Sequence, residues 1–88
     1  MSPAWSYVFT ARARRDLKRL DLPVRRKVIA ALDGLVTSDP PEGDVRKLAG
    51  SDEWRLRVGE WRVRFQRDPP QRMLYVLRVL PRGRAYRE

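Results

Sequence analysis

A change of hydrophobic period in the second half of the chain constrains the fold more than any other feature. Residues 54–58 and 61–65 alternate apolar and arginine side chains, and Gly59-Glu60 separates the two runs. Alternation with a period of two is typical of strands buried on one face, and a two-residue connection beginning with glycine is typical of a tight hairpin. The sequence therefore predicts a β-hairpin with one apolar and one arginine-rich face.

The first half of the chain has a helical period instead. Residues 11–20 form a predicted helix, and Thr10 is placed to cap its N-terminus. A helical period puts Ala13, Leu17 and Leu20 on its apolar face, and Arg12, Arg15, Asp16 and Arg19 on the other.

A second predicted helix begins after Asp21, a suitable cap, and ends before Asp39-Pro40-Pro41. The short connection at residues 20–22 predicts that the two helices form an antiparallel hairpin. The apolar residues of the second helix are Val24, Val28, Ile29, Leu32, Leu35 and Val36.

Two further strands complete the prediction. Residues 5–9 alternate as a short strand, and residues 73–80 are apolar on both faces apart from Arg78, as in a central strand. Residues 38–53 are rich in turn formers, with a short extended piece expected at 46–48. The predicted fold class is α+β, in the order β-α-α-β-β-β. A helical hairpin packs on one face of a small, mainly antiparallel four-stranded sheet, and residues 1–88 form one domain.

Composition excludes several kinds of chemistry. The 88 residues include no cysteine and no histidine, which removes disulfides, thiolate nucleophiles and the Ser-His-Asp and Cys-His arrangements. The 11 carboxylates are scattered, so we expect no metal and no other cofactor. Because no apolar run approaches the roughly 20 residues of a membrane span, we expect a cytoplasmic protein without a membrane partner.

The positive charge points to a polyanionic partner. Twenty Lys and Arg residues against 11 Asp and Glu give a net charge of +9. Residues 1–44 carry eight basic and six acidic residues (+2), whereas residues 45–88 carry twelve and five (+7). A general preference for arginine is the alternative explanation of the charge, but it does not account for this uneven distribution.

The predicted strands place several arginines on one surface. Residues of neighbouring strands lie about 5 Å apart, so a set of like charges there is unfavourable without an anion. The alternative is that these arginines only cover an exposed sheet face, with Asp52, Glu53 and Glu60 neutralising part of the charge. The surface comprises Arg55, Arg57, Arg62, Arg64 and Arg78, followed by the tail residues Arg82, Arg84, Tyr86 and Arg87.

Four segments carry a family resemblance. They are YVFTARARRDLKRL at 7–20, KLAG at 47–50, WRLRVGEWRVRF at 54–65 and LRVLPRGRAYR at 77–87. Together they resemble the RelE toxins of bacterial toxin–antitoxin pairs, within the RelE/ParE superfamily. The resemblance extends over nearly the whole chain and agrees with the predicted order of elements.

The resemblance implies a type II toxin that enters the ribosomal A site and cuts mRNA without a metal, thereby inhibiting translation. In that reaction the ribose 2′-OH attacks the adjacent phosphate and leaves a 2′,3′-cyclic phosphate. The implied catalytic residues are Arg57, Arg62, Arg82 and Tyr86, and the implied RNA-binding residues are Arg55, Arg64, Arg78, Arg84 and Arg87. The implied partners are ribosome, mRNA and a RelB-like antitoxin whose acidic, amphipathic segment covers the helical hairpin or the arginine surface.

The chain departs from the RelE pattern at two places. RelE toxins often carry lysine on the first strand of the hairpin, where this chain has Arg55 and Arg57, and many carry histidine at the position of Pro81. Arginine is not readily deprotonated, so either Tyr86 takes the 2′-OH proton or the reaction depends on positioning and charge.

Two other functions remain open. A ParE-like protein with the same fold would inhibit DNA gyrase without catalysis. A plain nucleic-acid-binding module would bind with a steep salt dependence and cut nothing.

Overall fold

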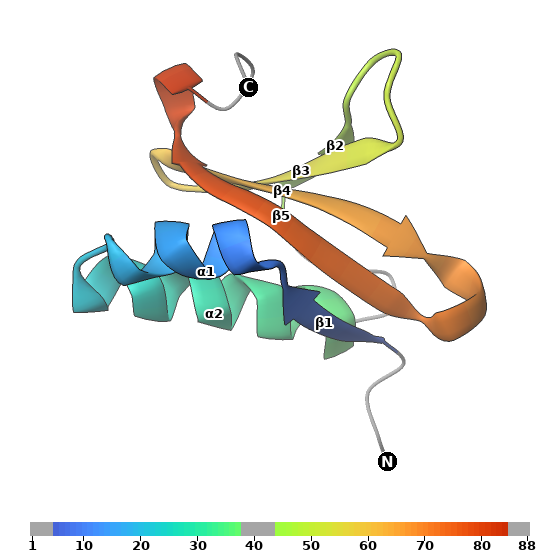
Figure 1. Cartoon of the computed structure of the whole chain (residues 1–88), viewed down its shortest axis with the longest axis horizontal. Coiled ribbons are helices and arrows are strands. Elements are labelled where there is room, and N and C mark those ends of the chain that lie inside the picture. Colours follow the sequence, from blue (N-terminus) through green and yellow to red (C-terminus); the bar gives the residue numbers. More distant parts are fainter. Residues whose placement is uncertain (1–4, 38–43, 85–88) are drawn as a thin grey trace.

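The computed structural model describes residues 5–37 and 44–84. Five strands form one mixed sheet in the order β1-β5-β4-β3-β2, in which β1 pairs parallel to β5 and the other neighbours are antiparallel. Both helices lie against one face of this sheet (Figure 1). The elements are β1 (Ser6–Phe9), α1 (Ala11–Lys18), α2 (Leu22–Thr37), β2 (Asp44–Lys47), β3 (Glu53–Val58), β4 (Trp61–Asp68), η1 (Pro69–Gln71), β5 (Met73–Pro81) and η2 (Arg82–Arg84).

The α+β class and the helical hairpin are confirmed, but the predicted number of four strands is wrong. The additional strand, β2, pairs antiparallel with β3 from Asp44↔Arg57 to Lys47↔Trp54. Four residues beside a turn-rich segment are too few to establish a period of two. Pairing with β3 creates this strand, and only the extended piece expected at 46–48 hinted at it.

The predicted hairpin forms around Gly59 and Glu60, with Val58 opposite Trp61. Gly59 has a φ of +58°, a conformation that glycine adopts without the steric penalty of a side chain. β4 continues three residues beyond the predicted end at Phe65, because residues 66–68 pair with β5.

Side-chain hydrogen bonds fix both ends of α1. The Ala13 amide donates to Thr10 Oγ1 at 3.2 Å, so Thr10 is the N-cap that the sequence predicts. At the other end, the Arg25 guanidinium from α2 donates to the carbonyl oxygens of Leu17, Lys18 and Leu20 at 3.2–3.4 Å. These bonds add donors to carbonyls at the C-terminal end of α1, of which that of Leu17 also accepts the Leu20 amide at 3.0 Å, and they hold the two helices together.

The core lies between the helices and the inner face of the sheet, as the hydrophobic pattern predicts. The inner face carries the apolar residues of the hairpin, including Leu56, Val63 and Phe65, which are almost completely buried. The other buried members of the cluster are Ala13, Leu17, Leu20, Val28, Leu32, Leu35, Val36, Leu74, Val76 and Val79.

The second half of β5 is bordered by α1 instead of a strand. Pairing with β1 ends at Phe9↔Val76, and Thr10 Oγ1 donates to the Leu77 carbonyl at 3.3 Å. Farther along, the Val79 amide donates to Asp16 Oδ2 at 2.9 Å. The side chains of Thr10 and Asp16 therefore satisfy main-chain groups of β5 that β1 does not reach, and these contacts hold α1 against the free edge of β5.

Candidate nucleic-acid interface

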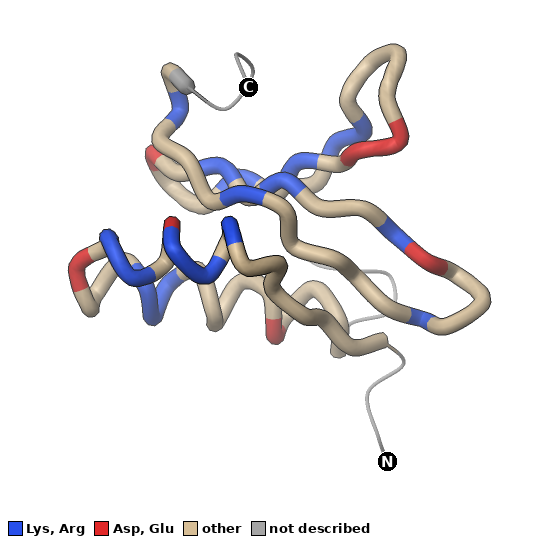
Figure 2. Tube along the Cα trace, viewed as in Figure 1, with Lys and Arg blue, Asp and Glu red and all other residues tan. Residues whose placement is uncertain are grey.

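Four arginines form one row across the outer face of the sheet. The strand register places Arg46 opposite Arg55, Arg55 opposite Arg64, and Arg64 opposite Arg78. Residues paired in this way share a face and lie about 5 Å apart at their Cβ atoms. We call Arg46, Arg55, Arg64 and Arg78 the arginine row. Figure 2 shows the corresponding run of basic positions across the strands.

Three of the residues predicted to be catalytic meet beside this row, at the hairpin turn. Arg57 lies opposite Arg62 in the register of β3 and β4. The Arg82 amide donates to the Glu60 carbonyl at 2.8 Å, which brings the start of η2 to the same turn. The fold thus places two arginines of one hairpin close to a third that is 20 residues farther along the chain.

Only part of this cluster faces solvent. Arg57 and Arg82 are exposed, whereas Arg55 and Arg62 are buried, with exposed fractions of 7% and 5%. Arg55 and Arg62 therefore lie on the arginine-rich face, as the alternation predicts, but other side chains cover them there. The physical reason is that long side chains on adjacent strands cover one another's aliphatic stems.

The Arg62 guanidinium forms hydrogen bonds with main-chain groups of the hairpin turn. Its Nη1 donates to the carbonyl oxygens of Gly59 and Trp61 at 2.7 and 2.9 Å. Its Nε is buried and makes no hydrogen bond within the described part of the chain. Arg62 consequently holds the hairpin in shape and adds positive charge beneath Arg57.

Two arginines of the row have carboxylate partners. Arg64 forms an ion pair with Glu53, one of the acids that the sequence suggested for this task. Arg78 donates through Nε and Nη2 to Asp16 at 2.8 and 3.3 Å, and both side chains are largely buried. These two pairs fix the orientation of Arg64 and Arg78.

Asp16 is a residue whose role the sequence analysis missed. It was assigned to the polar face of α1, yet it is 7% exposed and its carboxylate also accepts the Val79 amide. A signal was present, because Asp16 lies three residues after Ala13 and four before Leu20, in the same stripe of the helix. A charged residue in that stripe indicates a buried partner.

The remaining predicted site residues lie at the end of the chain. η2 ends at Arg84, whose side chain is not among the described parts, and Tyr86 and Arg87 lie outside the described residues. Among residues 5–37 and 44–84, no three His, Cys, Asp or Glu side chains gather as metal ligands do. No helix in those ranges has the length and apolarity needed to cross a membrane.

Tyr7 joins β1 to α2. Its hydroxyl donates to Asp33 Oδ1 at 2.6 Å. Burial, followed by the hydrogen bond and the negative charge of Asp33, raises the pKa of Tyr7 to about 12. The phenol therefore stays protonated at neutral pH and acts as a structural donor.

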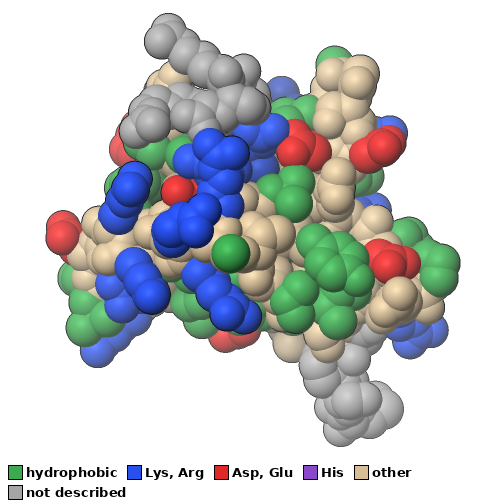
Figure 3. All heavy atoms as spheres, in the orientation of Figure 1, with side chains coloured by type: hydrophobic (Ala, Val, Ile, Leu, Met, Phe, Trp, Pro, Cys, Tyr) green, Lys and Arg blue, Asp and Glu red, His purple; other side chains and the backbone are tan. Residues whose placement is uncertain are grey.

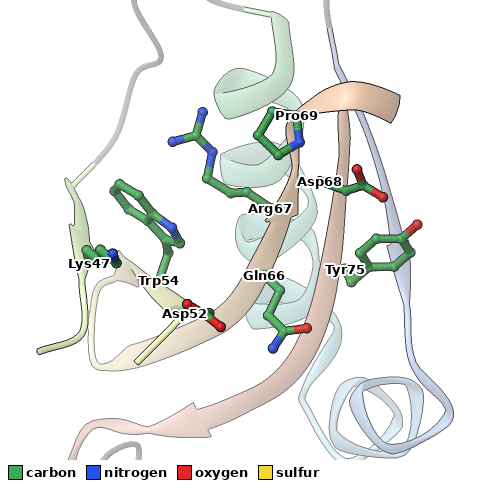
Figure 4. Close-up of a pocket in the computed structure, with 8 residues that line it drawn as sticks. All are labelled: Lys47, Asp52, Trp54, Gln66, Arg67, Asp68, Pro69 and Tyr75. Atoms are coloured by element: carbon green, nitrogen blue, oxygen red, sulfur yellow. The ribbon is translucent and has the colours of Figure 1, made fainter. Parts of the chain in front are cut away.

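A second group of side chains lies at the opposite end of the hairpin from the turn. The Arg67 guanidinium lies between two indoles, with Cζ 5.1 Å from the Trp5 ring centroid and 5.0 Å from that of Trp54. Trp54 and Arg67 also line an open cavity of about 500 Å³, shown in Figure 4. None of the predicted site residues whose side chains the structure describes lines this cavity. The lining residues are Lys47, Asp52, Trp54, Gln66, Arg67, Asp68, Pro69 and Tyr75.

Comparison with known proteins identifies a family that matches nearly the whole chain. Residues 7–86 match the family model described as the ParE toxin of the type II toxin–antitoxin system parDE. No curated protein sequence matches.

Solved structures with a similar fold include several RelE–RelB complexes. In the RelBE2 toxin–antitoxin complex of Mycobacterium tuberculosis, the similar chain is 26% identical, with a TM-score of 0.74 over 92% of this chain and 100% of that one. In the archaeal RelE–RelB complex of Pyrococcus horikoshii, it is 26% identical, with a TM-score of 0.77 over 93% and 99%. The chain from the intact Escherichia coli RelBE complex shares the fold at 23% identity and a TM-score of 0.70, over 88% and 95%.

Proposed function

Since the chain belongs to the RelE/ParE superfamily and is a toxin of a type II toxin–antitoxin system, we propose that it is a ribosome-dependent mRNA endoribonuclease of the RelE kind. The observation that carries this proposal is the meeting of Arg57, Arg62 and Arg82 at the hairpin turn. Two of the three face solvent, where a phosphate has access to them.

The proposed reaction needs stabilisation of negative charge more than it needs a cofactor. As the 2′-oxygen attacks the adjacent phosphorus and the 5′-oxygen leaves, negative charge grows on the phosphoryl oxygens. Guanidinium groups donate charge-assisted, bidentate hydrogen bonds to such oxygens. Arg57 and Arg82 would contact the phosphate directly, while Arg62 supports the turn and contributes charge from below. Either Tyr86 accepts the 2′-OH proton, or the reaction depends on positioning and charge.

The position of the scissile phosphate must come from outside the domain. Arg57 and Arg82 would bind phosphate groups and have no means of selecting a base, since phosphate contacts carry no direct sequence information. We therefore assign the orientation of the mRNA to the ribosomal A site, which converts binding into a reactive geometry.

An antitoxin partner is part of the same proposal. Several of the similar structures are complexes of RelE with RelB. By analogy, a RelB-like antitoxin with an acidic, amphipathic segment would bind this toxin and fold as it binds. Co-expression with the product of the neighbouring gene tests this, and failure of the two to co-purify contradicts it.

The experiment for the activity is a primer-extension map of mRNA incubated with the protein, with and without translating ribosomes. Cleavage within A-site codons only when ribosomes are present is the expected result. We expect R57A and R82A each to lower the cleavage rate about 10²–10³-fold, the usual effect of losing one donor to a developing oxyanion. R26A, an exposed arginine on α2, is the matched control and should cut at the wild-type rate.

Inhibition of DNA gyrase is the second candidate, because the matching family model is described as a ParE toxin. A supercoiling assay at stoichiometric protein separates the two functions. Gyrase inhibition with intact mRNA would replace the proposed activity. Salt-sensitive RNA binding with neither effect would reduce the protein to a nucleic-acid-binding module.

A further inference from the structure

The helical hairpin carries a second concentration of positive charge. All eight Lys and Arg residues of the first half lie between Arg12 and Lys27, together with only two aspartates. One of these, Asp16, is buried against Arg78, and Arg25 is bound to main-chain carbonyls. Among residues 11–27, one acidic residue, Asp21, and seven basic residues are therefore exposed. The basic residues are Arg12, Arg14, Arg15, Lys18, Arg19, Arg26 and Lys27.

Repulsion among these basic side chains destabilises α1 when no anion is bound. Arg12, Arg15 and Arg19 follow one another at spacings of three and four residues, at which helical side chains are neighbours. Like charges at those spacings destabilise a helix, and α1 has no acidic residue in its first turn. A bound polyanion would relieve this repulsion.

The basic side of α1 adjoins the arginine row. Arg12 lies four residues before Asp16, Arg19 lies three residues after it, and Arg15 directly precedes it. At about 100° per residue, all three arginines lie on the same side of the helix, next to Asp16. Asp16 binds Arg78, the last member of the row. In Figure 3 basic side chains gather over α1 and the adjoining part of the sheet. We call the arginine row together with Arg12, Arg15 and Arg19 the basic band.

We propose that the basic band is one RNA-binding surface, whose exposed contacts are Arg46 on the sheet and Arg12, Arg15 and Arg19 on α1. The largely buried Arg55, Arg64 and Arg78 lie between them. On this surface the RNA backbone passes from the outer face of the sheet around the edge of β5 onto α1. The proposal rests on the proposed ribonuclease function and extends it to a contact outside the reacting phosphate. Asp16 has a defined part in it, because its bond to Arg78 joins the two halves of the band.

The chemistry of α1 favours RNA over a peptide as the occupant. A segment that folds on binding needs apolar surface to bury. The exposed residues of α1 are Ala11 and four basic residues, and the basic residue Arg19 follows directly after the helix. Among the described residues, the exposed large apolar ones are Val8 in β1 and Leu22 at the start of α2. Phosphates of a nucleic acid bind to such a surface through charge alone.

The test is binding of a 20-nucleotide single-stranded RNA in which every 2′-OH is methylated, so that the proposed cleavage is blocked. Fluorescence anisotropy gives its affinity for the full chain between 50 and 200 mM NaCl. The variants are R15Q/R19Q in the band and R26Q/K27Q on α2 as a control of equal charge. Each phosphate contact of a single strand contributes about 0.7 to the slope of log K against log salt. We expect R15Q/R19Q to reduce the slope by about 1.4. Between 50 and 200 mM NaCl, the affinity of the variant should therefore fall by a factor about sevenfold smaller than that of the wild type.

An unchanged slope in R15Q/R19Q, or equal reductions in both double variants, would overturn the proposal. So would a loss of antitoxin binding by R15Q/R19Q with unchanged RNA binding, since α1 would then be a protein-binding surface. Primer extension on the same variants keeps the two proposals apart. If R15Q/R19Q lowers the slope but the wild-type protein leaves translated mRNA intact, the ribonuclease function is refuted. The proposal that the basic band binds RNA then still holds.

Discussion

The Asp16–Arg78 ion pair gives the sharpest prediction about stability. Asp16 accepts hydrogen bonds from Arg78 Nε, Arg78 Nη2 and the Val79 amide, and the two side chains are only 8% and 11% exposed. Removing one partner of a buried pair leaves the other charged and desolvated, which costs about 3–5 kcal/mol. We therefore expect D16A to lose about 3–5 kcal/mol of unfolding free energy.

This loss is large for a chain of 88 residues, whose total stability is expected to be about 4–13 kcal/mol. At about 4–8 °C per kcal/mol, D16A should lower Tm by at least about 12 °C. D16N keeps an oxygen for the Val79 amide and loses only the charge, so we expect a smaller cost of about 2 kcal/mol.

The assay is urea unfolding followed by tryptophan fluorescence for the wild type, D16A, D16N, R78M and D16N/R78M. Methionine replaces the arginine stem and removes its charge, so the double variant leaves no unpaired buried ion. We expect the double variant to be more stable than the sum of the single costs predicts, by at least about 1 kcal/mol. Additive costs within about 0.5 kcal/mol, or a D16A cost below about 1 kcal/mol, would refute the buried-pair argument.

Three other predictions concern contacts away from the hairpin turn. Tyr7 has a pKa of about 12 in the folded chain and 10 as its ordinary value, so the unfolded state loses this proton first and stability falls as pH rises between these values. The loss is about 1 kcal/mol after allowance for solvent screening, and a pH-dependent stability difference between wild type and Y7F over pH 9–12 measures it. R67M should lose about 1–2 kcal/mol of unfolding free energy because it removes a cation between two indoles, whereas R67K should retain part of that energy. Urea unfolding of both variants tests this order. Equal stability of R67M and the wild type would contradict the interaction. Arg72 has a φ of 51°, which glycine adopts more easily, so R72G should raise the unfolding free energy by about 0.5–1 kcal/mol, and a lower Tm would contradict that.

The hairpin shows how much of the fold was predictable. Its two alternating runs and the glycine between them are local signals, and the structure confirms the turn and the inward face. The helices are equally local, since Thr10 caps α1 and the apolar period of α2 matches its buried residues. β2 was beyond this reasoning, because four residues acquire strand conformation from pairing with β3.

The candidate site divides in the same way. The alternation of Arg55, Arg57, Arg62 and Arg64 is visible in the sequence, and with it the face they share. The burial of Arg62 and its bonds to the Gly59 and Trp61 carbonyls are not visible, because they depend on how neighbouring side chains cover one another.

Periods, caps and turns can be predicted from the amino-acid sequence, because they depend on residues within a few positions of each other. The α+β class, the arginine-rich face of the sheet and the family follow from them. Which charges meet depends instead on how the elements pack. The net charge of +2 over residues 1–44 conceals a basic helical hairpin, and Asp16 meets Arg78 across 62 residues. Such contacts are decided by the packing of α1 against the open edge of β5, a property of the assembled sheet that no local pattern encodes.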